Sequence, residues 1–352
     1  MIKYDSEFDT NDRFPSYLAG LILPTSIPSY HLDLQFNILG IGTSGCEIIR
    51  YLKDNNKYTQ NEDVTFIAIH NNADELKESK ADKTLLIADD QLKLDEHQQL
   101  ELEAKEYLRQ CINEQFEEAD FHFLFMLTSC IDLETSKITT FLVKLLAEKV
   151  SEGRGLFIAI INEPSASEGQ MEHGYIELLF KTCHTVIVNS TQRIEKLVNQ
   201  AQYPFNNYQS QSLVANYQVI RMFINAMTKR SMISCDFGIF CRIVSQEGKT
   251  KGKTNFVVGY GQGDKRAQTA IDQAIFDLQQ EWGDLKNIDF YPLVMMSATD
   301  QGINEYDLVS NTLYSYVSSD EFAPAVWMDL SSSMVDDVME ISVLLIKDSP
   351  TF

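Results

Sequence analysis

The order of apolar and polar residues predicts alternating strands and helices from residue 36 onward. Short apolar runs are typical of strands that are buried on both faces. These runs are Phe36–Ile41, Val64–Ile69, Phe121–Leu127, Leu156–Ile161 and Thr185–Asn189. The helical stretches between them are Gly45–Asp54, Asp95–Glu118, Ser136–Ser151 and Gly169–Thr182. This alternation predicts an α/β fold with a parallel sheet and helices on both of its faces.

A longer apolar-rich stretch at 210–230 predicts one continuous core helix, because its apolar residues recur at three- and four-residue steps. After it, we predict a second and smaller α/β unit. Its strands are Phe240–Val244, Thr254–Tyr260, Phe290–Ser297, Ala325–Leu330 and Glu340–Lys347, and its helices are Asp264–Trp282 and Tyr306–Val317. The resulting division is an extension at 1–35, a first domain at 36–208, the core helix at 209–232, a second domain at 233–348 and a tail at 349–352.

The composition narrows the function classes. With 51 acidic and 29 basic residues, the 352-residue chain has a formal net charge of −22, which argues against nucleic acid or an anionic membrane as a partner. The sequence contains no apolar run of about 18 residues and no secretion signal, so we expect a cytoplasmic protein. The 6 cysteines form no C-x-x-C pair, and we therefore expect reduced thiols and no metal site.

The stretch FNILGIGTSGCEIIRYL (36–52) runs from a strand through a glycine turn into a helix. Gly40, Gly42 and Gly45 match G-x-G-x-x-G, in which bare backbone and a helix N-terminus beginning near Ser44 can receive phosphate. The other interpretation is that these glycines only allow tight packing of strand against helix. A dinucleotide site would also need an acidic residue after the second strand, where His70 is followed by two asparagines.

Several segments, in order, resemble the tubulin/FtsZ family over about residues 36 to 348. FNILGIGTSGCE is similar to the family's first phosphate loop, FIAIHNNADELK to its second strand and loop, and IINEPSASEGQME to its ribose-contacting segment. MISCDFGIF resembles the loop after the central helix, and VVGYGQGDKRAQTAIDQAI a strand, turn and helix of the second domain. The resemblance implies an FtsZ/tubulin-like fold, with a GTPase-type domain, a long central helix and a smaller α/β domain.

The resemblance also implies which residues would contact a nucleotide, if one binds. On the central helix, a gapless count gives Leu213 and Val214 as the base-recognising pair, whereas a shift of about one turn gives Asn216. The matching positions are Gly40, Gly42, Ser44, Gly45, Asn71, Asn72, Glu168 and Asn216.

The family's glycine-threonine signature loop, G-G-G-T-G-T-G, is replaced by SCIDLET at 129–135. Side chains then fill the space where phosphate oxygens would meet bare backbone, and each like-charge contact would cost roughly 1–4 kcal/mol. A capped helix N-terminus is the plainer interpretation of this segment. The residues of this degenerate loop that matter most are Ser129, Asp132, Glu134 and Thr135.

The hydrolytic residues have changed as well. Asp236 remains in the loop after the central helix, as a residual catalytic carboxylate or only a helix cap, but Ile239 stands where the family has a second carboxylate. Isoleucine cannot orient or deprotonate water, so we expect hydrolysis to be absent or very slow.

The leading hypothesis is an FtsZ/tubulin-like cytoskeletal or cell-division-related bacterial protein, a pseudo-GTPase with no cofactor. Its partner would be itself, through longitudinal self-association, or another FtsZ/tubulin-like or division protein. Because residues 349–352 contain no tail peptide of the kind that reaches membrane anchors, we expect no direct membrane binding. The alternatives are a GTP-binding filament protein with a non-standard site, which would hold GTP or GDP, and a dinucleotide-binding Rossmann-type enzyme.

Overall fold

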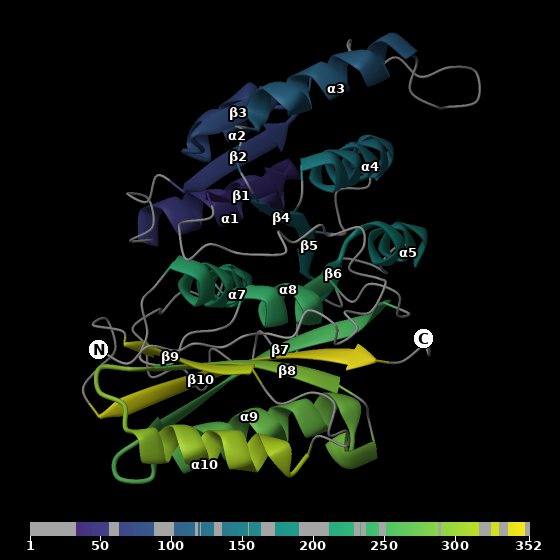
Figure 1. The fold of residues 1–352 in the computed structure, drawn as a ribbon. Helices are drawn as coiled ribbons and strands as arrows, with labels where there is room; N and C mark the ends of the chain where they lie inside the picture. The colour runs from purple at the N-terminus through teal and green to yellow at the C-terminus, as the bar shows by residue number, and fades with distance from the viewer. Residues whose placement is uncertain are drawn as a thin grey trace, which may run out of the picture.

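The computed structural model describes residues 33–55, 63–87, 102–116, 119, 121–129, 136–153, 155–162, 173–189, 211–228, 233, 237–245, 251–287, 290–316, 325–330 and 337–348. Within these ranges, helices and strands alternate and build a layered α/β fold (Figure 1).

The first part of the sheet is parallel, as the pattern of apolar runs predicts. Its strands lie in the order β3-β2-β1-β4-β5-β6, and each pairs with its neighbour in parallel. They are β1 (Leu34–Ile41), β2 (Val64–His70), β3 (Lys83–Leu86), β4 (Phe121–Ser129), β5 (Gly155–Asn162) and β6 (Thr185–Asn189). The burial of β1, β2, β5 and β6 along nearly their whole length explains why their sequences are apolar without alternation.

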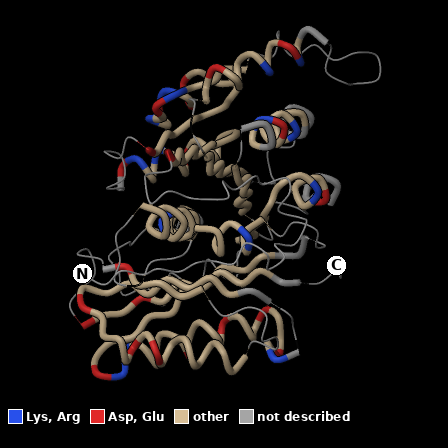
Figure 2. The backbone as a smooth tube through the Cα atoms, viewed as in Figure 1, with Lys and Arg blue, Asp and Glu red and all other residues tan. Residues whose placement is uncertain are grey.

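Helices cover both faces of this parallel part. α3, α4 and α5 share one apolar core with it, and α1 and α7 lie in the core of the opposite face. The helices of this part are α1 (Gly42–Asn55), α2 (Ala73–Glu78), α3 (Leu102–Gln115), α4 (Ser136–Gly153) and α5 (His173–Thr182). Charged residues concentrate on the outer helices and chain turns, while the strands carry few (Figure 2).

The second part of the sheet is mixed. Its strands lie in the order β7-β10-β8-β9, in which β10 runs antiparallel to both neighbours and β8 runs parallel to β9. A single pair, Ile187 with Thr254, joins it to the first part. Its elements are β7 (Lys251–Gln262), α9 (Arg266–Trp282), the 3₁₀ turn Leu285–Asn287, β8 (Phe290–Ala298), α10 (Ile303–Tyr314), β9 (Ala325–Leu330) and β10 (Val338–Asp348).

Two helices, α7 (Gln211–Thr228) and α8 (Phe237–Ser245), lie between the two parts of the sheet (Figure 1). Their apolar residues belong to one core that includes strands of both parts. A chain of aromatic rings makes this continuity visible: Phe123 of β4 lies 6.2 Å from Phe240 of α8, which lies 6.4 Å from Trp327 of β9. The prediction of one core helix at 210–230 is therefore confirmed.

The prediction of a strand at Phe240–Val244 is wrong, because this segment is part of helix α8. Phe237, Phe240, Cys241 and Val244 recur at helical spacing and face the shared core, so burial of this face selects the helix. The short elements α2 and β3 were not predicted, since only one α2 residue is buried and β3 has just 4 residues.

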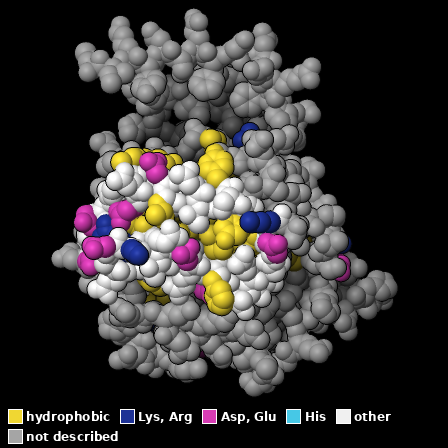
Figure 3. Space-filling model, turned by 90° about the horizontal axis from the view of Figure 1, so that it is seen from below, with side chains coloured by type: hydrophobic (Ala, Val, Ile, Leu, Met, Phe, Trp, Pro, Cys, Tyr) yellow, Lys and Arg dark blue, Asp and Glu magenta, His cyan; other side chains and the backbone are white. Residues whose placement is uncertain are grey.

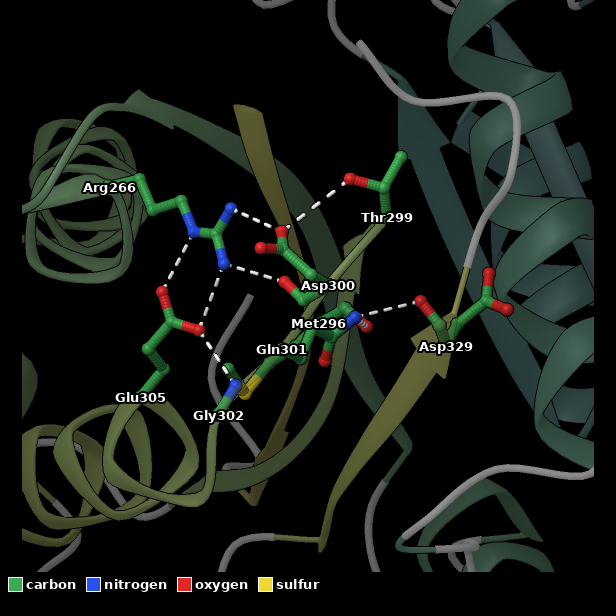
Figure 4. A network of polar contacts seen from close by, with 8 residues as sticks. All are labelled: Arg266, Met296, Thr299, Asp300, Gln301, Gly302, Glu305 and Asp329. Carbon is green, nitrogen blue, oxygen red and sulfur yellow. Dashed lines mark hydrogen bonds and ion pairs between the residues drawn. The ribbon is translucent and has the colours of Figure 1, made fainter. Parts of the chain in front are cut away.

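A buried arginine ties the α9 start to the α10 start (Figure 4). The Arg266 guanidinium, in a residue only 8% exposed, donates to Glu305 at 2.8 and 3.1 Å, to the Asp300 carboxylate at 2.8 Å and to the Asp300 carbonyl at 2.6 Å. Burial raises the pKa of Glu305, but hydrogen bonds from Arg266 and the Gly302 N–H bring the pKa below its ordinary value. Hydrogen bonding by Arg266 also lowers the pKa of Asp300.

Candidate functional site

The parallel strands place most of the predicted site residues along one edge of the sheet. Gly40 pairs with Leu127 on β4, Ser129 ends β4 beside Asn162, and Asn162 pairs with Asn189 at the end of β6. Open parallel sheets bind ligands in the crevice beyond this carboxyl edge. The fold therefore brings the glycine turn and the polar ends of the strands to the location that a nucleotide would need.

Close packing accounts for the glycines of the turn. A Cβ atom on Gly40 would lie 2.4 Å from the carbonyl oxygen of Gly45, and one on Gly45 would lie 2.7 Å from the Gly40 carbonyl carbon and 2.9 Å from the Leu127 oxygen. Gly42 has a φ of 75°, which L side chains rarely adopt. Because strand and helix meet through bare backbone, these glycines are required whether or not a phosphate binds.

A histidine side chain is hydrogen-bonded to Thr43, next to the glycine turn. His70, at the end of β2, accepts the Asn72 N–H on Nδ1 at 2.8 Å, so its Nε2 carries the proton and donates to the Thr43 hydroxyl at 3.0 Å. The imidazole thus connects the end of β2 to the first turn of α1. That turn contains no acidic residue, and Ser44 within it is partly buried.

A cluster of buried asparagines lies further along the edge, between the sheet and α7. Asn162 accepts hydrogen bonds on Oδ1 from Asn189 at 3.2 Å and from Asn216 at 3.0 Å. Asn189 and Asn216 are completely buried, and Oδ1 of Asn189 has no partner within the described part of the chain. An orphaned buried acceptor costs free energy, so this cluster is suited to a ligand that donates a hydrogen bond.

Among the other positions singled out from the sequence, Asn71, Asn72 and Ile239 lie within the described residues. Asn71 and Asn72 are exposed, and the Asn72 side chain accepts the Asp74 N–H at 2.8 Å, so that it caps α2. Ile239 is 42% exposed near the start of α8. The remaining positions, Asp132, Glu134, Thr135, Glu168 and Asp236, lie outside the described residues.

Sequence reasoning missed Asn162, Asn189 and the bridge between His70 and Thr43. Each asparagine is the last residue of a buried apolar strand, and two such endings on neighbouring parallel strands are a usable signal. The histidine bridge was not predictable, because it depends on the position of β2 relative to α1.

Comparison with solved structures identifies the architecture. The chain is similar to a mutant FtsZ of M. jannaschii, with 18% identity, a TM-score of 0.66 and coverage of 89% of this chain and 90% of that one. The fold is that of FtsZ and tubulin. An empty FtsZ dimer of M. jannaschii matches with 18% identity, a TM-score of 0.65 and coverage of 90% and 88%. A GTPγS-bound protofilament of CetZ2 from Haloferax volcanii matches with 13% identity, a TM-score of 0.60 and coverage of 90% and 94%.

No family model and no curated protein matches the sequence, so the FtsZ/tubulin-like architecture rests on structure. The predicted fold class is confirmed. No described helix is long and apolar enough to cross a membrane. Among the residues whose placement is described, no cluster of three or more His, Cys, Asp or Glu could hold a metal ion.

The two ends of the site offer different groups to a guanine nucleotide. Toward α7, Oδ1 of Asn189 is an acceptor without a partner among the described residues, in a buried polar cluster. At the glycine turn, the backbones of Gly40 and Gly45 are in close contact, and His70 is hydrogen-bonded to Thr43. On the face seen from below Figure 1, apolar side chains gather near the middle of the described surface, with acidic and basic side chains around them (Figure 3).

Proposed function

We propose that this chain is an FtsZ/tubulin-like cytoskeletal protein that acts by self-association and does not hydrolyse GTP. The observation that carries the proposal is Ile239, 42% exposed near the start of α8, where the family resemblance expects a catalytic carboxylate. An isoleucine there can contact a neighbouring subunit but cannot act on water.

The phosphate end of the site supports the same proposal. The glycine turn is accounted for by packing, and His70 is bound to Thr43 across its mouth. In the sequence, Asp132 and Glu134 stand at the two threonine positions of the signature loop and would repel a triphosphate. The chain keeps the scaffold, the first glycine turn and Asp236, whereas the glycine-threonine loop and the second carboxylate are replaced.

Self-association is the form of partner binding that the comparisons favour. One structural neighbour is an FtsZ dimer and another is a CetZ2 protofilament, and both cover about nine-tenths of this chain. The proposed contact joins the α8 end of one copy to the carboxyl edge of the sheet in the next.

The test is sedimentation of purified protein with GTP, with GDP and without nucleotide, together with phosphate release. We expect equal pelleting in all three conditions and no release of phosphate. Ile239→Asp should reduce pelleting, whereas Phe276→Asp, an equally drastic change at a 57% exposed site on α9, should not. GTP-dependent pelleting with steady phosphate release would contradict the proposal.

The second candidate is a filament protein that binds GTP at a non-standard site. The unpaired Oδ1 of Asn189 favours it, because a guanine base carries hydrogen-bond donors. This candidate predicts that Asn189→Leu weakens guanosine binding at least tenfold. Equal binding by the variant and the unaltered protein, or no binding by either, would remove it.

A further inference from the structure

Four polar residues form a single row across the second part of the sheet. In register, Tyr260 of β7 lies beside Glu340 of β10, Glu340 beside Ser297 of β8, and Ser297 beside Asp329 of β9. Glu340, Ser297 and Asp329 are 2%, 0% and 3% exposed. A buried polar row that crosses every strand of a sheet is unusual, since buried strand positions are mostly apolar.

The central helix α7 lies along this row and contacts it with three polar side chains. Gln218 donates to the Tyr260 hydroxyl at 2.8 Å, Arg221 forms an ion pair with Glu340, and Asn225 donates to Asp329 at 2.7 Å. From 218 to 225 the helix advances about 10.5 Å, and three strand spacings cover about 14 Å. The side chains of Gln218, Arg221 and Asn225 reach their partners across the difference between these two lengths.

Apolar and polar contacts both position α7, and Phe223 lies 5.3 Å from Phe125 and 5.2 Å from Phe240. The pitch of a helix, about 5.4 Å, is close to the strand spacing of about 4.8 Å, so a slide by one turn moves each side chain about one strand along the row. After such a slide Arg221 would face Ser297 or Tyr260, and the buried carboxylate of Glu340 would lose its cation. An unpaired buried charge is strongly unfavourable, so the polar contacts disfavour the displaced registers.

These contacts are not arranged for maximum stability. Oε1 of Gln218 and Nε of Arg221 are buried without a hydrogen-bond partner among the described residues. A buried ion pair with incomplete hydrogen bonding is often no more stable than apolar residues of the same size. Its best-attested role in proteins is to fix a register.

We propose that the row of Tyr260, Glu340, Ser297 and Asp329 is a register key that holds α7 in one position on the second part of the sheet. Because α7 also packs on α1 and β6, the key fixes how the two parts of the molecule are oriented relative to each other. The key operates whether or not the chain binds a nucleotide.

The experiment measures the distance between the two parts by double electron–electron resonance. Spin labels are attached to p-acetylphenylalanine at Lys77 of α2 and Gln280 of α9, both exposed, so the native cysteines are not labelled. The unaltered protein should give one narrow distribution. The double variant Arg221→Met with Glu340→Met should fold with an unchanged or higher Tm and gain a second population displaced by about 5 Å.

A second variant keeps the test decisive if the first does not fold. Asn225→Asp leaves the ion pair intact but places a second carboxylate against Asp329, and it should also broaden or split the distribution. Arg109→Met, which removes an exposed arginine and its ion pairs with Glu106 on α3 and Glu148 on α4, is the matched control and should leave the distribution unchanged. A narrow, unshifted distribution in either folded register variant would overturn the proposal.

Discussion

The glycine turn offers a prediction whose magnitude follows from the structure. Gly40→Ala places a Cβ 2.4 Å from the Gly45 carbonyl oxygen and 2.6 Å from its carbon, and both contacts are to backbone. Most real Cβ contacts lie beyond about 3.4 Å, so β1 and α1 must separate by roughly 1 Å. Overpacking of this kind costs about 1–3 kcal/mol of the free energy of unfolding.

Two comparison variants bracket this value. Gly259→Ala meets the Ala270 carbonyl oxygen at 1.8 Å and should cost at least as much as Gly40→Ala. Gly302→Ala meets only the flexible Glu305 carboxylate at 3.8 Å, and at a helix N-cap should cost roughly 0.5 kcal/mol.

The assay is urea unfolding of nucleotide-free protein, with the free energy obtained by linear extrapolation. If Gly40→Ala is within about 0.5 kcal/mol of the unaltered protein, the glycines are not required by packing. Close packing would then not account for the glycines, and close approach of a phosphate would be the remaining explanation.

Three further predictions concern buried polar groups. Arg266→Met should lower the free energy of unfolding by roughly 2–3 kcal/mol in urea at pH 7, because Glu305 stays partly buried without its partner. The pair with the exposed Asp300 should contribute little to this loss. The folded pKa of Glu305 is lowered from its ordinary value of 4.5, so this stabilisation is present above pH 4.5 and is lost as the pH falls through the folded pKa. The difference in unfolding free energy between variant and unaltered protein should therefore close in acid, and a constant difference would contradict this. Burial and the charge of Lys149 lower the pKa of His122, so the folded state binds fewer protons than the unfolded state. The free energy of unfolding should therefore decrease as the pH is lowered below about 6.5. His122→Gln should remove that decrease, as measured by Tm against pH. Asn216→Leu should cost about 1–3 kcal/mol of unfolding free energy, because it leaves the buried Asn162 short of one donor.

The sequence was sufficient to predict the parallel part of the sheet and the central helix. Strands such as Phe36–Ile41 and Leu156–Ile161 are buried on both faces, so their apolar runs are unbroken and easily recognised. The segment Phe240–Val244 was mistaken for a strand because it is short and mostly apolar. Its apolar residues, taken together with Phe237, recur at helical spacing, so the longer window carried the correct signal.

The site was less predictable than the fold. Gly40, Gly42 and Gly45 were found from the sequence, and the close contact between Gly40 and Gly45 shows that packing alone requires glycine at both positions. The asparagine cluster and the polar row against α7 depend on the register of several strands, which local sequence does not specify. Sequence order therefore located the carboxyl edge of the sheet, and the contacts within it required the structure.

The central claim is that the phosphate end of this FtsZ/tubulin-like site no longer holds a triphosphate. Calorimetric titration of GTP into nucleotide-free protein tests it most directly. The account predicts no saturable heat up to about 1 mM ligand, which corresponds to binding weaker than about −4 kcal/mol. A single-site isotherm with a dissociation constant near 1 μM, about −8 kcal/mol, would contradict it.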